Sequence, residues 1–135
     1  MCIPCLSFLS CRGAMIYTGV DLIEIERIGR IFERYGERFL RRCYTEEEQR
    51  YARGRAPQLA SRFAAKEAVM KALGTGVHGV AWTEVEVVRM RGRAPEIVLH
   101  RRAKTRAERM GIKRIAVSLS HSRDFAIASV VAEAD

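Results

Sequence analysis

The feature that most constrains the fold is a long helical segment in the middle of the chain. Residues 58–73 are rich in Ala, Lys, Glu and Met, which are strong helix formers. Gly74, Thr75 and Gly76 follow directly, and glycine is the residue that most often ends a helix. The sequence therefore predicts a helix over residues 58–73 that stops at Gly74.

The residues before this helix predict one strand and further helices. Residues 15–20 form a short β-prone run, and from Leu22 apolar residues recur every three or four positions as far as Phe39. Gly36 is expected to bend or end that first helix. Thr45 and Glu48 have the spacing of a capping box, which predicts a short helix to about residue 53.

Strand patterns dominate the chain after Gly76. Residues 83–90 and 96–100 read as two strands joined by a hairpin connection over residues 91–95. A basic helix over 101–110 and two strands over 115–119 and 125–131 complete the pattern. The chain is therefore predicted to form a single α+β domain, with helices packed on an antiparallel sheet.

Length and charge limit the function classes. The 135 residues carry a formal net charge of +8, which favours an anionic partner such as nucleic acid, a phosphorylated cofactor or an acidic protein. No apolar run approaches the roughly 18–20 residues that span a bilayer, so we expect no membrane partner and a cytoplasmic protein.

The first fourteen residues differ from the rest of the chain. They hold Cys2, Cys5 and Cys11, whereas the body contains Cys43 alone. Cys2 and Cys5 have the spacing of half a zinc site, but no second pair follows at zinc-finger spacing. We interpret residues 1–14 as an upstream extension or the product of an incorrect start codon, and residues 15–135 as the domain.

Glu67 is the first candidate for chemistry. On a helix its nearest side chains are Phe63, Ala64, Met70 and Lys71, so the carboxylate is partly desolvated unless a cation compensates it. Lys71 at i+4 would do so in an ordinary surface ion pair, and a divalent cation is the alternative.

Asp21 is the second candidate, because it follows a β run. It can act as a helix N-cap or as a metal ligand at a strand end. Mg²⁺ takes one or two protein carboxylates and completes its shell with phosphate oxygens and water. Asp21 and Glu67 supply such a pair if the fold brings them together.

Arginines form a third element. They recur at spacings of three and four along the first predicted helix, on one side of it, which suits either solvent or an acidic partner. The residues are Arg27, Arg30, Arg34, Arg38 and Arg41. His121, at a strand end, is either structural or able to contact a phosphate or an adenine ring.

Three segments together resemble the holo-acyl-carrier-protein synthase family, the small phosphopantetheinyl transferases. The first motif lies at residues 19–28, the second and most specific at 62–76, and the third at 118–121. The similarity holds from Met15 to the C-terminus. Relatives often carry Gly-Lys-Pro where this chain has Gly92-Arg93-Ala94-Pro95.

The resemblance implies a phosphopantetheinyl transferase fold, a homotrimer with active sites between subunits, and a role in fatty acid biosynthesis. It implies transfer of the 4'-phosphopantetheine group from coenzyme A to a serine of an acidic apo-acyl carrier protein, with Mg²⁺. The matching residues are Asp21 and Glu67 for the metal, Glu67 and Lys71 for catalysis, Arg62, Lys66, Gly74, Thr75, Gly76 and His121 for the nucleotide, and Arg27 and Arg34 for carrier docking.

The sequence is also compatible with other proton acceptors and other functions. The sequence does not identify the base that takes the serine proton; Glu67 can act directly or through a water on the metal. A small basic RNA- or DNA-binding module would also fit the charge, but the few aromatic residues offer no evident platform for stacking bases. A catalytically dead homologue that serves as a trimeric interaction protein would not need Asp21, Glu67 and Lys71 together.

Overall fold

The computed structural model describes residues 13–135. The elements follow one another as β1 (Met15–Glu24), α1 (Ile25–Tyr35), α2 (Glu37–Cys43), α3 (Glu46–Ala52), α4 (Ala56–Leu73), α5 (Gly76–Gly79), a 3₁₀ turn η1 (Trp82–Glu84), β2 (Val85–Val88), β3 (Glu96–Leu99), α6 (Arg101–Arg109), β4 (Ile112–His121) and β5 (Phe125–Ala134). The predicted α+β class is confirmed.

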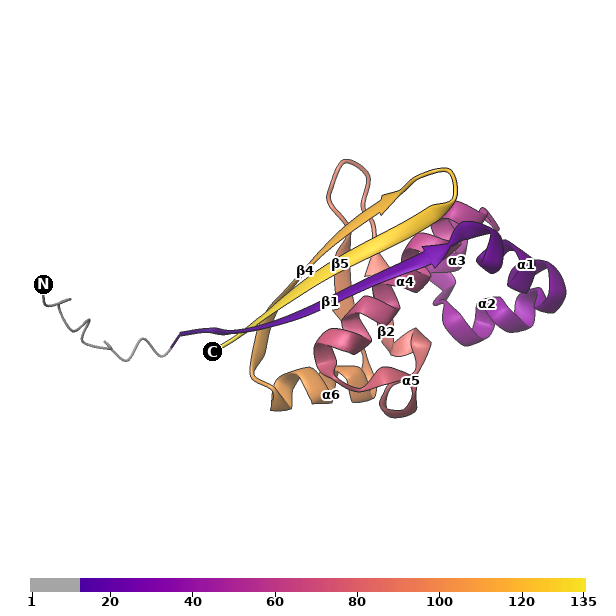
Figure 1. Cartoon of the computed structure of the whole chain (residues 1–135). Coiled ribbons are helices and arrows are strands. Elements are labelled where there is room, and N and C mark those ends of the chain that lie inside the picture. The colour runs from indigo at the N-terminus through magenta and orange to yellow at the C-terminus, as the bar shows by residue number, and fades with distance from the viewer. Residues whose placement is uncertain (1–12) are drawn as a thin grey trace, which may run out of the picture.

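The main sheet joins the two ends of the described chain (Figure 1). Its strand order is β1-β5-β4, with both pairs antiparallel, and β1 pairs with β5 from Met15 opposite Ala134 to Glu24 opposite Phe125. β2 and β3 form a separate antiparallel pair, as the hairpin pattern predicted. The first strand is therefore held by the last one.

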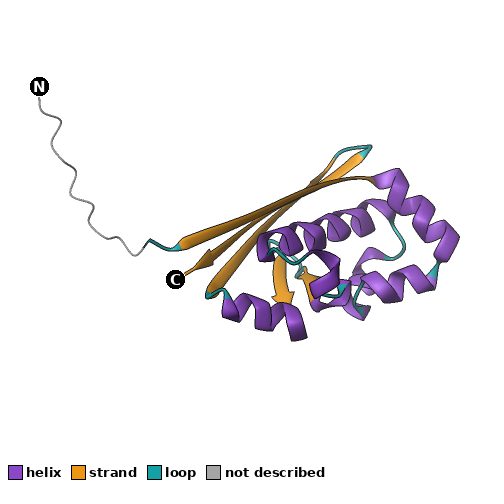
Figure 2. Ribbon diagram, turned by 60° about the horizontal axis from the view of Figure 1, so that its bottom comes forward, coloured by secondary structure: helices purple, strands orange, loops and turns teal. Residues whose placement is uncertain are grey.

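Helix α4 covers one face of the main sheet (Figure 2). Alternate residues of β5 are buried beneath it, and most of them are alanines, as are many residues of α4. Small side chains on both surfaces allow helix and sheet to approach closely, and the close contact supplies the dispersion energy of the core.

Gly19 makes the closest of these contacts. A Cβ atom at this position would lie 1.8 Å from the carbonyl oxygen of Ala68, so no other residue fits without moving α4. Because Gly19 lies two residues before Asp21 and Ala68 directly follows Glu67, this contact brings the two candidate carboxylates onto facing elements.

The first predicted helix differs from the observed structure in two ways. The strand β1 runs on to Glu24, so Leu22 and Asp21 are strand residues and the helix begins at Ile25. The cause is the pairing with β5, which a local pattern does not reveal. The helix then ends at Tyr35, because Gly36 at φ +54° separates α1 from α2.

Most other boundaries agree with the sequence-based prediction. The capping box of Thr45 and Glu48 is present at the start of α3, and α4 ends at Gly74 in the left-handed conformation. The strands β4 and β5 are longer than predicted, since each has a full-length partner. Of the predicted extension, residues 1–12 with Cys2, Cys5 and Cys11 lie outside the described residues, and β1 begins at Met15.

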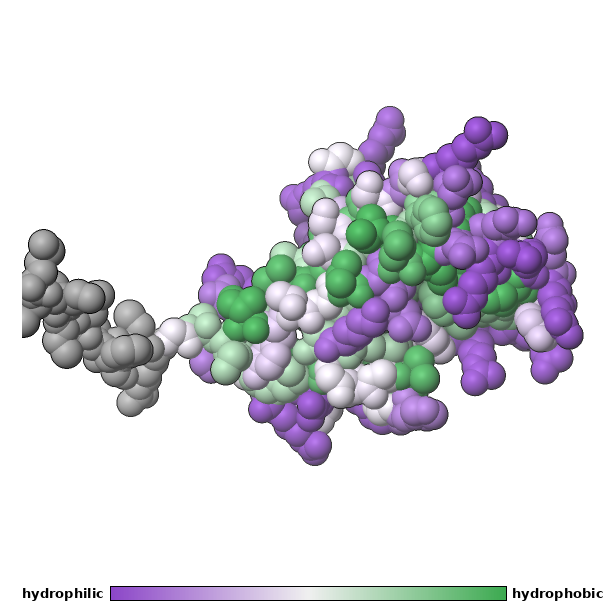
Figure 3. All heavy atoms as spheres, viewed as in Figure 1, coloured by the Kyte–Doolittle hydropathy of each residue, from purple (hydrophilic) through white to green (hydrophobic). Residues whose placement is uncertain are grey.

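The face of the main sheet opposite α4 is apolar and exposed (Figure 3). Large apolar side chains of β1 and β5 point outward from it. They are Ile16, Val20, Leu22, Phe125, Ile127 and Val131. We call this surface the outer sheet face. An antiparallel sheet that faces water normally carries polar residues there, so this face is suited to burial against another surface.

Candidate active site

The carboxylates of Asp21 and Glu67 lie near one another where β1 faces α4. Both are half-buried. Burial raises the pKa of Glu67, and the negative charge of Asp21 raises it further, while Lys71 and Arg27 act in the opposite direction. Two carboxylates that repel each other in a partly desolvated place are a favourable site for a divalent cation.

Lys71 belongs to the same cluster and is bonded to β1. Its Nζ donates to the Asp21 carboxylate at 3.1 Å and to the Val20 carbonyl oxygen at 2.9 Å. Within the described chain, no ion pair joins Lys71 to Glu67. The surface pair at i and i+4 is therefore not formed, and Lys71 ties α4 to the strand instead.

Asp21 does not cap a helix either. It lies inside β1, and the residue before α1 is Glu24, whose side chain makes no capping hydrogen bond. Both ordinary structural interpretations of the pair are therefore wrong. Only Lys71 forms an ion pair with Asp21 within the described residues, and its ammonium is half-exposed, so a ligand can reach it.

The cluster fits magnesium better than a metal held by protein alone. Among the residues that the structure describes, no group of three or more His, Cys, Asp or Glu side chains is placed to hold a metal. Mg²⁺ needs only one or two carboxylates when phosphate oxygens and water complete its octahedral shell. Asp21 and Glu67 suit that type of site.

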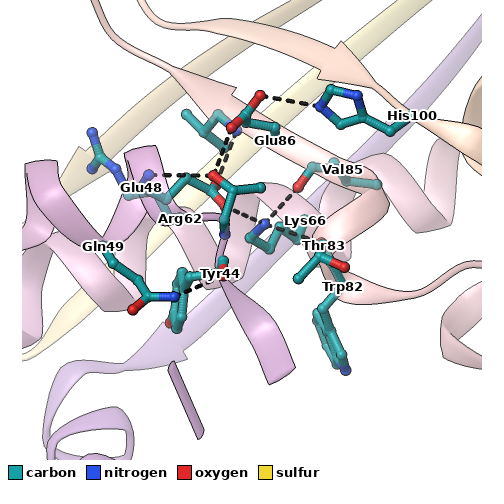
Figure 4. A network of polar contacts seen from close by, with 12 residues as sticks. Tyr44, Glu48, Gln49, Arg62, Lys66, Trp82, Thr83, Val85, Glu86 and His100 are labelled. Carbon is teal, nitrogen blue, oxygen red and sulfur yellow. Dashed lines mark hydrogen bonds and ion pairs between the residues drawn. The ribbon is translucent and has the colours of Figure 1, made fainter. Parts of the chain in front are cut away.

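Lys66 is not at the surface, in contrast to its predicted contact with the nucleotide (Figure 4). Its Nζ donates to Glu48 at 2.7 Å, to the Trp82 carbonyl at 3.0 Å and to the Val85 carbonyl at 2.5 Å. An ammonium has three hydrogens, so none is free for a ligand. We therefore assign Lys66 to the core and remove it from the nucleotide set.

Glu48 completes this buried pair. One carboxylate oxygen accepts from the Thr45 backbone N–H and from Lys66, and the other accepts from the Val87 backbone N–H at 3.0 Å. Glu48, the third residue of α3 and a member of its capping box, therefore also binds α4 and β2. The sequence pattern predicted the capping box, but it did not indicate that Glu48 also binds Lys66 and Val87.

Arg62 and His121, far apart in sequence, line one pocket of about 220 Å³ together with Tyr51 and Arg89. We call this the arginine pocket. The Arg62 guanidinium lies over the Tyr51 ring, 4.1 Å from its centre. Sequence reasoning missed Tyr51 and Arg89, because each comes from another element and has no motif of its own.

Two exposed glycines, Gly74 and Gly76, follow α4 on either side of the partly buried Thr75. Gly74 and Gly76 have φ values of +70° and +58°, which favour glycine. The Thr75 hydroxyl is buried and has no hydrogen-bond partner within the described residues. Arg27 and Arg34 are exposed on α1, whereas Arg38 and Arg41 of the predicted row lie beyond the break, on α2.

Comparisons with known proteins agree in one family. The model of the 4'-phosphopantetheinyl transferase superfamily matches residues 17–130. A holo-(acyl-carrier-protein) synthase of Herpetosiphon aurantiacus is 50% identical over 124 residues, covering 87% of this chain and 98% of that relative. One from Solibacter usitatus is 46% identical over 123 residues, covering 88% and 98%.

Solved structures show the same likeness. The holo-(acyl-carrier-protein) synthase of Neisseria meningitidis matches with a TM-score of 0.80 and 35% identity, covering 88% of this chain and 99% of that one. The enzyme of the same name from Helicobacter pylori, solved in complex with coenzyme A, matches with a TM-score of 0.77 and 31% identity, covering 87% and 99%.

Proposed function

This chain belongs to the 4'-phosphopantetheinyl transferase superfamily, and we propose that Asp21, Glu67 and Lys71 form its reaction centre. As a holo-(acyl-carrier-protein) synthase, the chain transfers the 4'-phosphopantetheine group from coenzyme A to a serine of an apo-acyl carrier protein. The product serves fatty acid biosynthesis. The observation that carries the proposal is the half-buried carboxylate pair, with its raised Glu67 pKa, beside an accessible lysine.

Asp21 and Glu67 would hold Mg²⁺ between them. When bound, the ion neutralises the pyrophosphate of coenzyme A and stabilises the charge that develops during phosphoryl transfer. Gly19 supports this role, because it allows β1 to lie against α4 at the level of the pair.

The transfer requires a nucleophile, a leaving group and an acceptor for one proton. The serine oxygen of the carrier attacks the β-phosphorus, the bond from that phosphorus to the bridging oxygen breaks, and adenosine 3',5'-bisphosphate leaves. We propose that Glu67 accepts the serine proton, directly or through one water. The Lys71 ammonium, held on Val20 and Asp21, adds positive charge near the same phosphate.

The nucleotide part of coenzyme A is assigned to Arg62 and His121 and to the loop of Gly74, Thr75 and Gly76. Arg62 and His121 share the arginine pocket, and the loop offers backbone at positive φ together with an unpaired Thr75 hydroxyl. These are groups that can donate hydrogen bonds to phosphate and ribose.

The carrier protein is expected to dock on α1. Arg27 and Arg34 are exposed there, and the charge of Arg27 already reaches Glu67. An acidic carrier bound to this helix would therefore deliver its serine close to the reaction centre.

The working form is a homotrimer whose active sites lie between neighbouring subunits. The outer sheet face supports this proposal, since large apolar side chains on β1 and β5 stand exposed in the single chain. Among residues 13–135, no helix is both long enough and apolar enough to cross a membrane. A cytoplasmic location stays a prediction from the sequence.

The decisive experiment incubates the protein with coenzyme A, Mg²⁺ and an apo-acyl carrier protein, and then weighs the carrier. We expect a gain of one phosphopantetheine, and we expect chelation of the metal to prevent it. No gain with a carrier that another synthase modifies would refute the proposed function.

A further inference from the structure

Helix α6 is strongly basic, and neither the sequence motifs nor the reaction scheme gives it a role. Its buried residues are Ala103 and Ala107, and its long charged side chains are exposed. An amphipathic helix that shows its charges to solvent is the ordinary explanation for this pattern. Arg102 and Arg106 do more than face solvent, because each donates a hydrogen bond to another element. The two bonds adjoin opposite ends of residues 74–81, which we call the exit segment of α4.

Arg106 binds the chain at the start of the exit segment. Its Nε donates to the carbonyl oxygen of Leu73, the last residue of α4, at 3.1 Å. Carbonyl groups in the last turn of a helix lack partners within the helix and carry the negative end of its dipole, so an arginine suits them. The guanidinium also lies against Gly74, since a Cβ atom there would be 3.7 Å from Arg106 Nη2. Arg106 thus fixes the point at which the chain leaves α4.

Glu84 binds the other end of the exit segment. Its side chain is buried, and one carboxylate oxygen accepts from the Ala81 backbone N–H at 3.0 Å. The other oxygen accepts from Arg102 Nε at 3.2 Å and from Arg101 Nε at 3.4 Å. Arg102 and Arg106 are four residues apart, so they lie on the same side of α6. One turn of α6 therefore holds both ends of the exit segment.

Between these two points the exit segment is exposed and rich in glycine. Gly74, Gly76 and Gly79 give its backbone more conformational freedom than other residues would. Val77 and His78, in its middle, are exposed, so core packing does not hold this part. A segment of this kind opens locally at a low cost in free energy unless contacts at its ends prevent it.

We propose that Arg106 is a positioning residue that keeps the loop of Gly74, Thr75 and Gly76 in the conformation that binds coenzyme A. The proposal rests on the proposed function, because that function assigns the loop to this ligand. Arg106 acts through the Leu73 carbonyl and needs no contact with the ligand. The apparent affinity of a site falls in proportion to the fraction of the protein in the binding conformation. Loss of the bond should therefore weaken binding and leave the chemical step unchanged.

Variants of equal length separate the hydrogen bond of Arg106 from its charge. In Arg106→Gln the side-chain amide nitrogen takes the place of Nε, because both atoms follow Cδ, so a donor is kept while the charge is lost. Arg106→Met has a similar length and no donor. Arg109→Met is the matched control, since Arg109 is exposed on the same helix, about one turn beyond Arg106. Melting temperatures show that each variant is folded.

Hydrogen exchange of the full chain, followed by mass spectrometry, measures the opening of the exit segment directly. The backbone N–H groups of Gly74 and Thr75 donate to the carbonyls of Lys71 and Met70, so their exchange requires local opening. In Arg106→Met these amides should exchange about two- to tenfold faster, the factor expected for one lost hydrogen bond. Arg106→Gln and Arg109→Met should exchange as the wild type does.

Calorimetry and steady-state kinetics with coenzyme A measure the consequence for binding. Arg106→Met should weaken binding of coenzyme A and raise its KM by a similar factor of about two to ten, with kcat nearly unchanged. Arg106→Gln and Arg109→Met should keep values close to those of the wild type. A role in stability alone would move the melting temperature without this separation of KM from kcat.

The outcomes separate this inference from the proposed function. Equal loss of affinity in the Gln and Met variants would mean that the charge of Arg106 acts on the ligand, and the positioning role would be refuted. Unchanged exchange or unchanged affinity in Arg106→Met would refute it as well. If exchange and affinity change as expected, but the wild type never modifies a carrier protein, the positioning role stands and the transferase function is refuted.

Discussion

Lys66 and Glu67 are neighbours in sequence, yet they belong to two ionic groups of opposite character. Lys66 and Glu48 form a pair with no side-chain exposure, in which every ammonium hydrogen and both carboxylate oxygens have partners. Glu67 belongs to a partly exposed group with Asp21 and Lys71. This group has two carboxylates and one half-exposed lysine.

The difference shows how the same residue types serve structure or chemistry. The buried pair is saturated, so it holds α3, α4 and β2 together and offers nothing to a ligand. In the group of Asp21, Glu67 and Lys71, the two carboxylates repel each other, and this repulsion raises the pKa of Glu67. Adjacent positions on a helix point about 100° apart, so one helix can carry both groups side by side.

The largest effect should follow from Glu67→Gln. Losing the charge should remove metal binding and several kcal/mol of transition-state stabilisation, so carrier labelling should fall by at least about a hundredfold. The measurement is mass spectrometry of the carrier. Because its surroundings raise the pKa of Glu67, the ionised group costs stability at neutral pH, and the variant should unfold no more readily than the wild type. Retained labelling would exclude Glu67 from the reaction.

Lys66→Met tests the opposite side of the comparison. Removing one partner leaves the Glu48 carboxylate buried and unpaired, and we expect a loss of about 3–5 kcal/mol in the free energy of unfolding, measured in urea. Lys71→Met is the matched control. Its ion pair is half-exposed, so its removal should cost less than about 1 kcal/mol while transfer is lost. Equal destabilisation by both changes would contradict the distinction.

Gly19→Ala tests the contact that brings the two carboxylates together. The new Cβ would overlap the Ala68 carbonyl, so α4 must shift, at a cost of about 1–3 kcal/mol, and the affinity for Mg²⁺ should fall with it. Gly29→Ala is the control, because its Cβ would meet only Ala56, at 3.7 Å. That change should be neutral or slightly stabilising, since alanine favours a helix.

The smallest expected effect is on the pH dependence of stability, and it comes from Glu86, near the buried Lys66–Glu48 pair. Burial acts to raise the pKa of Glu86, but hydrogen bonds from Thr45 and His100 outweigh it and hold the pKa below its usual range. The stability it contributes is present above the pKa of the unfolded chain and is lost as pH falls through the folded pKa. In Glu86→Gln, the free energy of unfolding should therefore fall less on acidification than in the wild type, by less than about 1 kcal/mol. An unchanged slope would show that Glu86 does not contribute.

Local signals predicted the parts of the fold that depend on local chemistry. The cap at Thr45, the helix stop at Gly74 and the break at Gly36 each follow from residues within one turn. The end of β1 was misplaced, because Leu22 and Ile23 are held in the strand by β5, at the other end of the sequence.

The residues of the candidate site also fall into those that the sequence predicted and those that it did not. Asp21, Glu67 and Lys71 were predicted together and lie together. Lys66 was assigned to the nucleotide because the family resemblance implied it, and no residue close to it in sequence indicates its buried pairing with Glu48. Tyr51 and Arg89 were missed because a pocket between elements exists only after folding.

The pairing of β1 with β5 has a consequence for the order of folding. Asp21 lies opposite Ala128, so its place in the sheet is fixed by a strand that follows nearly the whole domain. Contacts over such a separation form late, because a long loop must close first. The reaction centre should therefore assemble after α4 and its buried pair, and the first functional carboxylate in the sequence should be among the last to be positioned.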